Sequence, residues 1–200
     1  MPYKRLRSAF ISTFLRQTFV MGVGVVSISF ISKLLGPVEF GRYAMAMAGV
    51  ALGQAVFTFS APPVIVHFFT KVKDRSCLVG NGFALVLSAL VLAAALVAFF
   101  YWRGWLGEWK IDGFSLFLMM LFMVFQTVNS MLEAILLGAR NYKVFNFLKI
   151  VVLVVLLASV LVVLRTGDGW RDALSMSCAA ALTATPWYVF FSLKELGGVR

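Results

Sequence analysis

Four polar side chains recur at helical spacing within an apolar stretch, and they are the residues best placed to do chemistry. They are Gln126, Asn129, Ser130 and Glu133. Offsets of three, four and seven residues fall on one side of an α-helix, so the four define a polar stripe. An ionised carboxylate facing hydrocarbon costs at least ~2.5 kcal/mol, so the stripe must face other helices or a water-filled cavity. Two interpretations stay open: a cavity wall in which Glu133 responds to protons or ions, and interhelical hydrogen bonds worth about 0.6 kcal/mol each.

Arg16 is the natural cationic partner for Glu133. Both residues lie about two turns from the same end of their expected helices, so they could share a depth. Gln17 adjoins Arg16, and Gln54 lies on a polar face of the second apolar segment. A guanidinium suits phosphate because its planar donors grip two oxygens at once. The sequence therefore predicts either an interior cation at Arg16 or a side chain that reaches back to the headgroups.

Six apolar segments must position these residues, each long enough to cross ~30 Å of hydrocarbon as an α-helix. Their expected spans are about 10–35, 43–66, 78–102, 114–137, 147–164 and 173–192. The chain is 62% hydrophobic and 13% charged, with a mean hydropathy of +0.94, which is more apolar surface than a soluble domain can bury. We expect an all-α membrane protein, a six-transmembrane-helix bundle in which residues 1–200 form one transmembrane domain with no soluble domain.

The net charge of +10 is distributed unevenly between the segments. One side collects eleven cations, namely Lys4, Arg5, Arg7, Lys71, Lys73, Arg75, Arg140, Lys143, Lys149, Lys194 and Arg200. The other side collects six, namely Lys33, Arg42, Arg103, Lys110, Arg165 and Arg171. The positive-inside rule then predicts that both termini are cytoplasmic and that the protein is multi-pass. Since the basic residues flank apolar segments, the charge reflects topology, and no nucleic-acid partner is expected.

Sequence signatures of catalysis are missing. The chain has one histidine and lacks HExxH, GxSxG, Walker and Rossmann patterns, so no catalytic residue, metal site or cofactor is expected. Cys77 and Cys178 lie in different segments without metal-type spacing, and we expect two free thiols.

Several residues predict local features of the helices. Gly49 and Gly53 have the small-xxx-small spacing that lets helices approach closely. Pro62 and Pro63 should kink or end the second helix, and a hinge for alternating access is one interpretation. The Lys149 side chain is expected to snorkel to the membrane interface.

Aromatic residues flank the expected outer loops, a distribution typical of rings that anchor at headgroup level, with carbohydrate stacking as the alternative. They are Tyr101, Trp102, Trp105, Trp109 and Trp170.

The segment Leu-Leu-Gly-Pro-Val-Glu-Phe-Gly-Arg-Tyr at 34–43 predicts a tight turn between the first two helices. Gly36 and Pro37 stop the first helix, and Glu39 favours a new helix start. The string also resembles the first inter-helix turn of polysaccharide and O-antigen flippases of the multidrug/oligosaccharidyl-lipid/polysaccharide exporter superfamily. The matching positions are Gly36, Pro37, Glu39, Phe40, Gly41 and Tyr43.

This resemblance implies a function in polysaccharide biosynthesis at the bacterial inner membrane. It implies that lipid-linked oligosaccharide, such as a lipopolysaccharide precursor, is flipped by alternating access, with membrane lipid and glycan-assembly proteins as partners. Its candidate binding residues here are Arg16, Gln17, Gln54 and the polar stripe. Members usually have two six-helix lobes and this chain supplies one, so we expect an incomplete half that needs a second lobe. A drug/cation antiporter, a non-transporting subunit of a glycan-assembly complex and a membrane glycosyltransferase stay open as alternatives.

Overall fold

The computed structural model describes residues 2–104, 112–166 and 169–197. Within these ranges it describes the side chains except at residues 2–13, 15, 16, 160, 161 and 163–166. Over the described residues the chain forms six helices and no strands, which confirms the all-α fold class.

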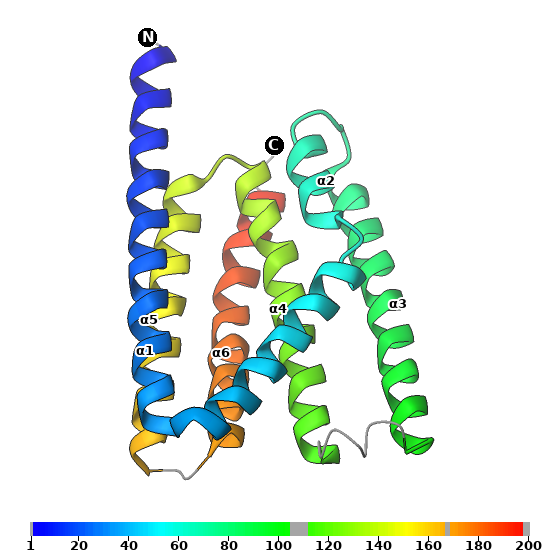
Figure 1. Cartoon of the computed structure of the whole chain (residues 1–200). Helices are drawn as coiled ribbons and strands as arrows, with labels where there is room; N and C mark the ends of the chain where they lie inside the picture. Colours follow the sequence, from blue (N-terminus) through cyan, green and yellow to red (C-terminus); the bar gives the residue numbers. More distant parts are fainter. Residues whose placement is uncertain (1, 105–111, 167–168, 198–200) are drawn as a thin grey trace.

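The first helix, α1 (Pro2–Phe57), is folded back at Gly36. Gly36 has φ 71° and ψ 171°, a conformation that glycine adopts without steric cost. Pro37 begins the second arm, where its missing N–H costs no intrahelical bond. In Figure 1 the first arm descends and the second returns diagonally across the bundle. The tight turn predicted at 34–43 is present, and it is shorter than expected because the helix resumes at once.

A second break lies at residues 58–60. Phe59 and Ser60 have φ values of 46° and 57°, and the short helix α2 (Ala61–Phe68) follows with Pro62 and Pro63 in its first turn. Prolines are tolerated there because the first N–H groups of a helix have no intrahelical acceptor. The predicted interruption is therefore confirmed, although the prolines start the new helix instead of ending the old one.

Four long helices complete the chain: α3 (Arg75–Trp102), α4 (Gly113–Gly138), α5 (Tyr142–Thr166) and α6 (Trp170–Gly197). Pro186 lies inside α6 without ending it. Helix α4 lies in the middle of the bundle and packs against every other helix (Figure 1). Its buried residues are spread from Ser115 to Gly138. The polar stripe predicted for this segment therefore lies on the central helix.

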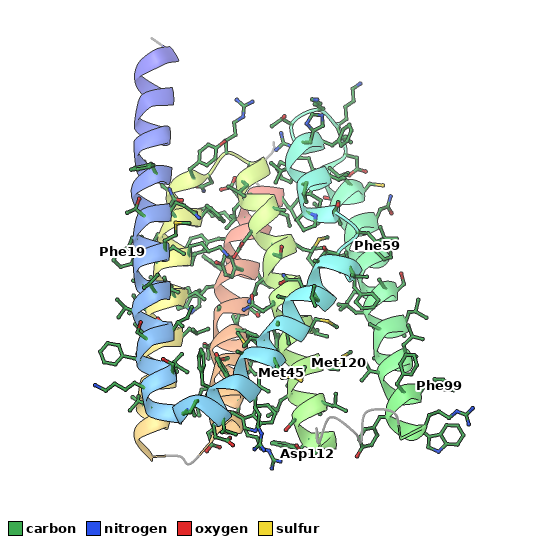
Figure 2. The ribbon with its side chains drawn as sticks, in the orientation of Figure 1. Phe19, Met45, Phe59, Phe99, Asp112 and Met120 are labelled. Atoms are coloured by element: carbon green, nitrogen blue, oxygen red, sulfur yellow. The ribbon has the colours of Figure 1, made fainter. Side chains whose placement is uncertain are left out.

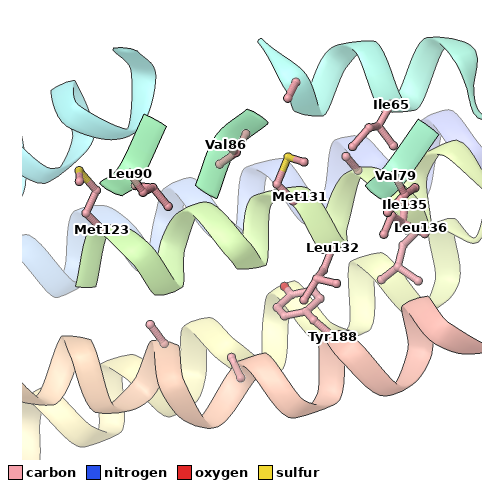
Figure 3. Close-up of a cluster of buried hydrophobic side chains, with 14 of the residues drawn as sticks. Ile65, Val79, Val86, Leu90, Met123, Met131, Leu132, Ile135, Leu136 and Tyr188 are labelled. Carbon is pink, nitrogen blue, oxygen red and sulfur yellow. The ribbon is translucent and has the colours of Figure 1, made fainter. Parts of the chain in front are cut away.

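The main hydrophobic core joins α4 to α2, α3 and α6 (Figure 3). Its largest fully buried members include Ile65, Phe122, Met131, Ile135 and Tyr188. Glycines set the spacing of the packed helices. A Cβ at Gly53 would lie 2.6 Å from Met123 Sδ, and one at Gly49 would lie 3.2 Å from Met119 Cε. The predicted close approach at Gly49 and Gly53 is confirmed, with α4 as the neighbour.

The outer surface of the bundle is apolar. Large hydrophobic side chains such as Leu52 and Val91 are about 70% exposed (69% and 71%), and Phe19 and Phe99 lie on the outer edges of the view in Figure 2. So much exposed apolar surface suits a hydrocarbon environment. Among the described residues, five helices are long and apolar enough to cross a membrane: α1 from Gln17 onward, α3, α4, α5 and α6.

The aromatic residues expected at the interface separate into three groups. Tyr101 and Trp102, at the end of α3, are exposed as an interfacial pair would be. Trp105 and Trp109 lie outside the described residues. The prediction for Trp170 is wrong, because this residue is only 7% exposed. It belongs to a small buried cluster that also contains Ile31 of α1 and Leu174 of α6.

Candidate functional site

An ion pair joins Glu133 of α4 to Lys149 of α5. Glu133 Oε1 lies 2.7 Å from Lys149 Nζ, and the two side chains are 15% and 39% exposed. The ammonium of Lys149 is turned to this carboxylate, and snorkelling of Lys149 to the interface stays a prediction. Direct pairing lowers the cost of holding Glu133 in a mostly buried position.

Asn129, one turn earlier on α4, forms a hydrogen-bonded cluster with α6. Its Nδ2 donates to the backbone oxygen of Ala181 at 3.1 Å, and its Oδ1 accepts from Thr185 Oγ1 at 3.0 Å. Thr185 Oγ1 also lies 2.9 Å from the Ala181 oxygen. The cluster directly precedes Pro186, the residue that removes a backbone donor from α6. At Asn129 the stripe therefore acts through interhelical hydrogen bonds.

The start of the stripe faces the second arm of α1. Gln54 Nε2 donates to the backbone oxygen of Gln126 at 3.3 Å. Gln126 lies about one turn along α4 from Met123, the residue that packs against Gly53. The side chains of Gln126 and Ser130 are half-buried. The stripe on α4 thus contacts three helices in turn. Gln126 contacts Gln54 of α1, Asn129 contacts α6, and Glu133 contacts α5.

The turn residues anchor α1 to the start of α6. Glu39 accepts the backbone N–H of Trp170 through Oε2 at 3.5 Å and pairs with Arg42 at 2.8 Å through Oε1. A carboxylate at a helix N-terminus is favoured by the exposed N–H groups and the helix dipole. The Tyr43 hydroxyl lies 3.2 Å from Ser177 Oγ, and both side chains are buried. The turn at 34–43 therefore has a structural role, because it holds α1 against the start of α6.

The remaining turn positions differ in their packing. Phe40 packs against the small core that contains Tyr43. No atom lies within 4 Å of a Cβ built at Gly41, so this position has open space. Glu39 and Tyr43 are the turn residues that form hydrogen bonds with α6.

A second ionic contact holds the same end of the bundle together. Asp112, just before α4, pairs with Arg171 of α6 at 3.1 Å. The hydrogen bond from the Ser115 hydroxyl, assisted by the charge of Arg171, holds the pKa of the Asp112 carboxyl below its ordinary value.

Arg16 lies within α1, but its side chain is outside the described set. The Arg16–Glu133 pair therefore stays a prediction. Gln17 is exposed on the first arm of α1.

Sequence reasoning missed Lys149 as the partner of Glu133, although the sequence holds a signal. The two residues lie eight positions before and eight positions after Asn141, which sits in the short connection between α4 and α5. Residues equidistant from a short connection come to similar depths in antiparallel helices. Thr185 of α6 also contacts the polar stripe, through its hydrogen bond to Asn129.

Comparison with protein-family models, with curated proteins and with solved structures found no match for this chain.

Proposed function

We propose that this chain is a six-crossing lobe of a transporter that moves lipid-linked oligosaccharide across the bacterial inner membrane. The observation that carries the proposal is the Glu133–Lys149 pair, a mostly buried carboxylate and a more exposed ammonium in contact within two apolar helices. Ionisable groups at such positions are costly and mark ion or substrate pathways in membrane proteins.

Lys149 can exchange Glu133 for a phosphate of the substrate, and a transport cycle requires such reversible binding. Lys149 is 39% exposed, so an incoming pyrophosphate can compete with Glu133 for the ammonium. Protonation of Glu133 removes the competing charge and favours phosphate binding, and loss of that proton restores the ion pair and releases the phosphate. Proton binding and substrate binding are thereby linked through one lysine.

The two arms of α1 supply the first two of the six crossings, with the Gly36 turn on the outer side and both termini in the cytoplasm. The charge distribution of the sequence supports this orientation. A second six-helix lobe supplies the opposite wall of the cavity, so that rocking of one lobe against the other gives alternating access. The likeness of the Gly36 turn to that of polysaccharide flippases favours a sugar-pyrophosphate lipid as the substrate.

The test is export of surface polysaccharide from cells that depend on this chain and carry Glu133→Gln or Lys149→Gln. Each variant should reduce export at least about tenfold, because each removes one member of the exchange. Lys143→Gln is the matched control, since Lys143 is an exposed lysine on the same helix. Unchanged export in both site variants would overturn the proposal and favour a non-transporting subunit. Loss of resistance to cationic drugs with normal polysaccharide would favour the drug/cation antiporter.

A further inference from the structure

A pocket opens at the end of the bundle where α2, α3, α4 and the carboxyl end of α6 meet. Its volume is about 310 Å³, near the lower limit of about 300 Å³ for small-ligand sites. Arg75, Arg140 and Glu195 line it together with Phe69 and Gly138. In Figure 1 the ends of these helices lie together near the C-terminus. This pocket is far along α4 from the Asn129 cluster and contains none of the proposed transport residues.

Arg75 is held in place by an aromatic ring. Its Cζ lies 5.0 Å from the centre of the Phe69 ring, within the range of a cation–π contact. The ring is fully buried, and a Cβ at Gly138 would lie 2.6 Å from the Phe69 Cβ. Only glycine at 138 leaves room for the Phe69 ring in this position. The packing of α2 on α4 therefore fixes the ring on which the Arg75 guanidinium lies.

Arg140 occupies a backbone conformation that favours glycine. It has φ 60° and follows Ala139, the C-cap of α4. The Arg140 N–H donates to Leu137 O at 3.0 Å, and the Asn141 N–H donates to Leu136 O at 3.0 Å. These two bonds define a Schellman motif, in which the left-handed position is usually glycine. An arginine here is strained, and strain of this kind marks positions where the side chain has a function.

Glu195, the carboxylate in the lining of the pocket, bonds to an asparagine instead of to Arg75 or Arg140. Glu195 Oε1 accepts from Asn141 Nδ2 at 2.7 Å. Among the described side chains the ion pairs are Arg42–Glu39, Lys149–Glu133 and Arg171–Asp112, so no described carboxylate neutralises either pocket guanidinium. The pocket thus offers two available cations and one anion.

We propose that this pocket binds a phosphate ester that carries a primary amine, as in a phosphoethanolamine headgroup. The two guanidiniums bind the phosphate through charge-assisted hydrogen bonds, and Glu195 accepts from the ammonium. The ligand is either the headgroup of a membrane lipid or a free phosphoester.

The test measures retention of added lipid on the full chain in detergent by native mass spectrometry. The probes are phosphatidylethanolamine and phosphatidylglycerol, which share the phosphate and differ in the amine. The chain should retain phosphatidylethanolamine in preference, and Arg75→Gln and Arg140→Gly should each weaken this retention about tenfold. Glu195→Gln keeps an acceptor for Asn141, so it should abolish the preference while leaving phosphatidylglycerol binding intact.

Arg140→Gly separates a binding role from a structural one. Glycine relieves the strain, so this variant should unfold at higher temperature than the parent while it loses the lipid. The control is the double variant Lys143→Gln/Lys194→Gln, which removes two exposed charges outside the lining of the pocket. Retention by Arg75→Gln and Arg140→Gly equal to that of the control would overturn the proposal, and so would equal retention of the two lipids. Tighter binding of O-phosphoethanolamine than of phosphatidylethanolamine assigns the site to a free phosphoester, and weaker binding assigns it to a lipid headgroup.

Discussion

Glu133 and Lys149 should be energetically coupled, and a double-mutant cycle measures the coupling. The variants are Glu133→Gln, Lys149→Gln and the two combined, which keep the side-chain volumes nearly constant. Each single change leaves a charge in a partly buried position without its counter-charge, whereas the combined change leaves none. The cost of the double variant should therefore be smaller than the sum of the two single costs.

The expected size follows from the geometry of the pair. Two unit charges 2.7 Å apart attract with about 6 kcal/mol at an effective dielectric constant of ~20. Desolvation cancels most of this attraction, and solvent screens Lys149 because it is 39% exposed. We expect a coupling free energy of about 1–2 kcal/mol. The assay is equilibrium unfolding in mixed micelles with increasing amounts of a denaturing detergent.

The control is the same cycle on Glu39 and Arg42, a pair three residues apart on one helix with side chains 31% and 55% exposed, whose coupling should be only about 0.3–0.5 kcal/mol. The reasoning would be refuted if the cost of the double variant equalled the sum of the two single costs within about 0.5 kcal/mol, because independent sites are additive to that accuracy.

Three further predictions concern packing, topology and pH. Gly53→Ala should destabilise the protein by about 1–3 kcal/mol in the same unfolding assay, because its Cβ would overlap a methionine sulfur of α4, whereas Gly24→Ala meets no atom within 4 Å and should be neutral or stabilising. Cys77 is exposed at the start of α3, so a membrane-impermeant maleimide should label it in inside-out vesicles and not in intact cells, while the buried cysteine of α6 stays unlabelled on both sides. Labelling of Cys77 in intact cells would contradict the proposed orientation. Because the folded-state pKa of Asp112 is lowered, its stabilising contribution is present above the ordinary pKa and is lost as pH falls through the lowered value. Thermal unfolding should therefore show Asp112→Asn destabilised at neutral pH and equal to the parent at strongly acidic pH, and a difference that persists in acid would argue against the Arg171 contact.

The local breaks of the fold could be predicted from the sequence because their causes are local. Gly-Pro at 36–37 and the proline pair at 62–63 act on the backbone of their own segment. The sequence could not tell that helix resumes directly at Pro37, since both a loop and a kink begin with the same residues. Gly49 and Gly53 predicted a close helix contact, yet only the fold identifies α4 as the partner.

Partners across helices were harder to predict than faces within a helix. Periodicity placed Asn129 and Glu133 on one side of α4, but it contains no information on which neighbour faces them. The position of Lys149 near a helix end predicts snorkelling, but it does not reveal that Glu133 is the carboxylate that its ammonium contacts. The position of Trp170 in the chain predicts an aromatic belt, whereas the fold buries this residue in a cluster formed by α1, α4 and α6.

The claim that Glu133 and Lys149 exchange partners during transport is tested most directly by swapping their charges. The variant Glu133→Lys/Lys149→Glu keeps an ion pair between α4 and α5 and moves the ammonium to the more buried position. Its unfolding free energy should be close to that of the parent, and its export of surface polysaccharide should stay about as low as that of Glu133→Gln. Export restored to the parent level by the swap would contradict the account, because the pair would then be needed only to hold the two helices together.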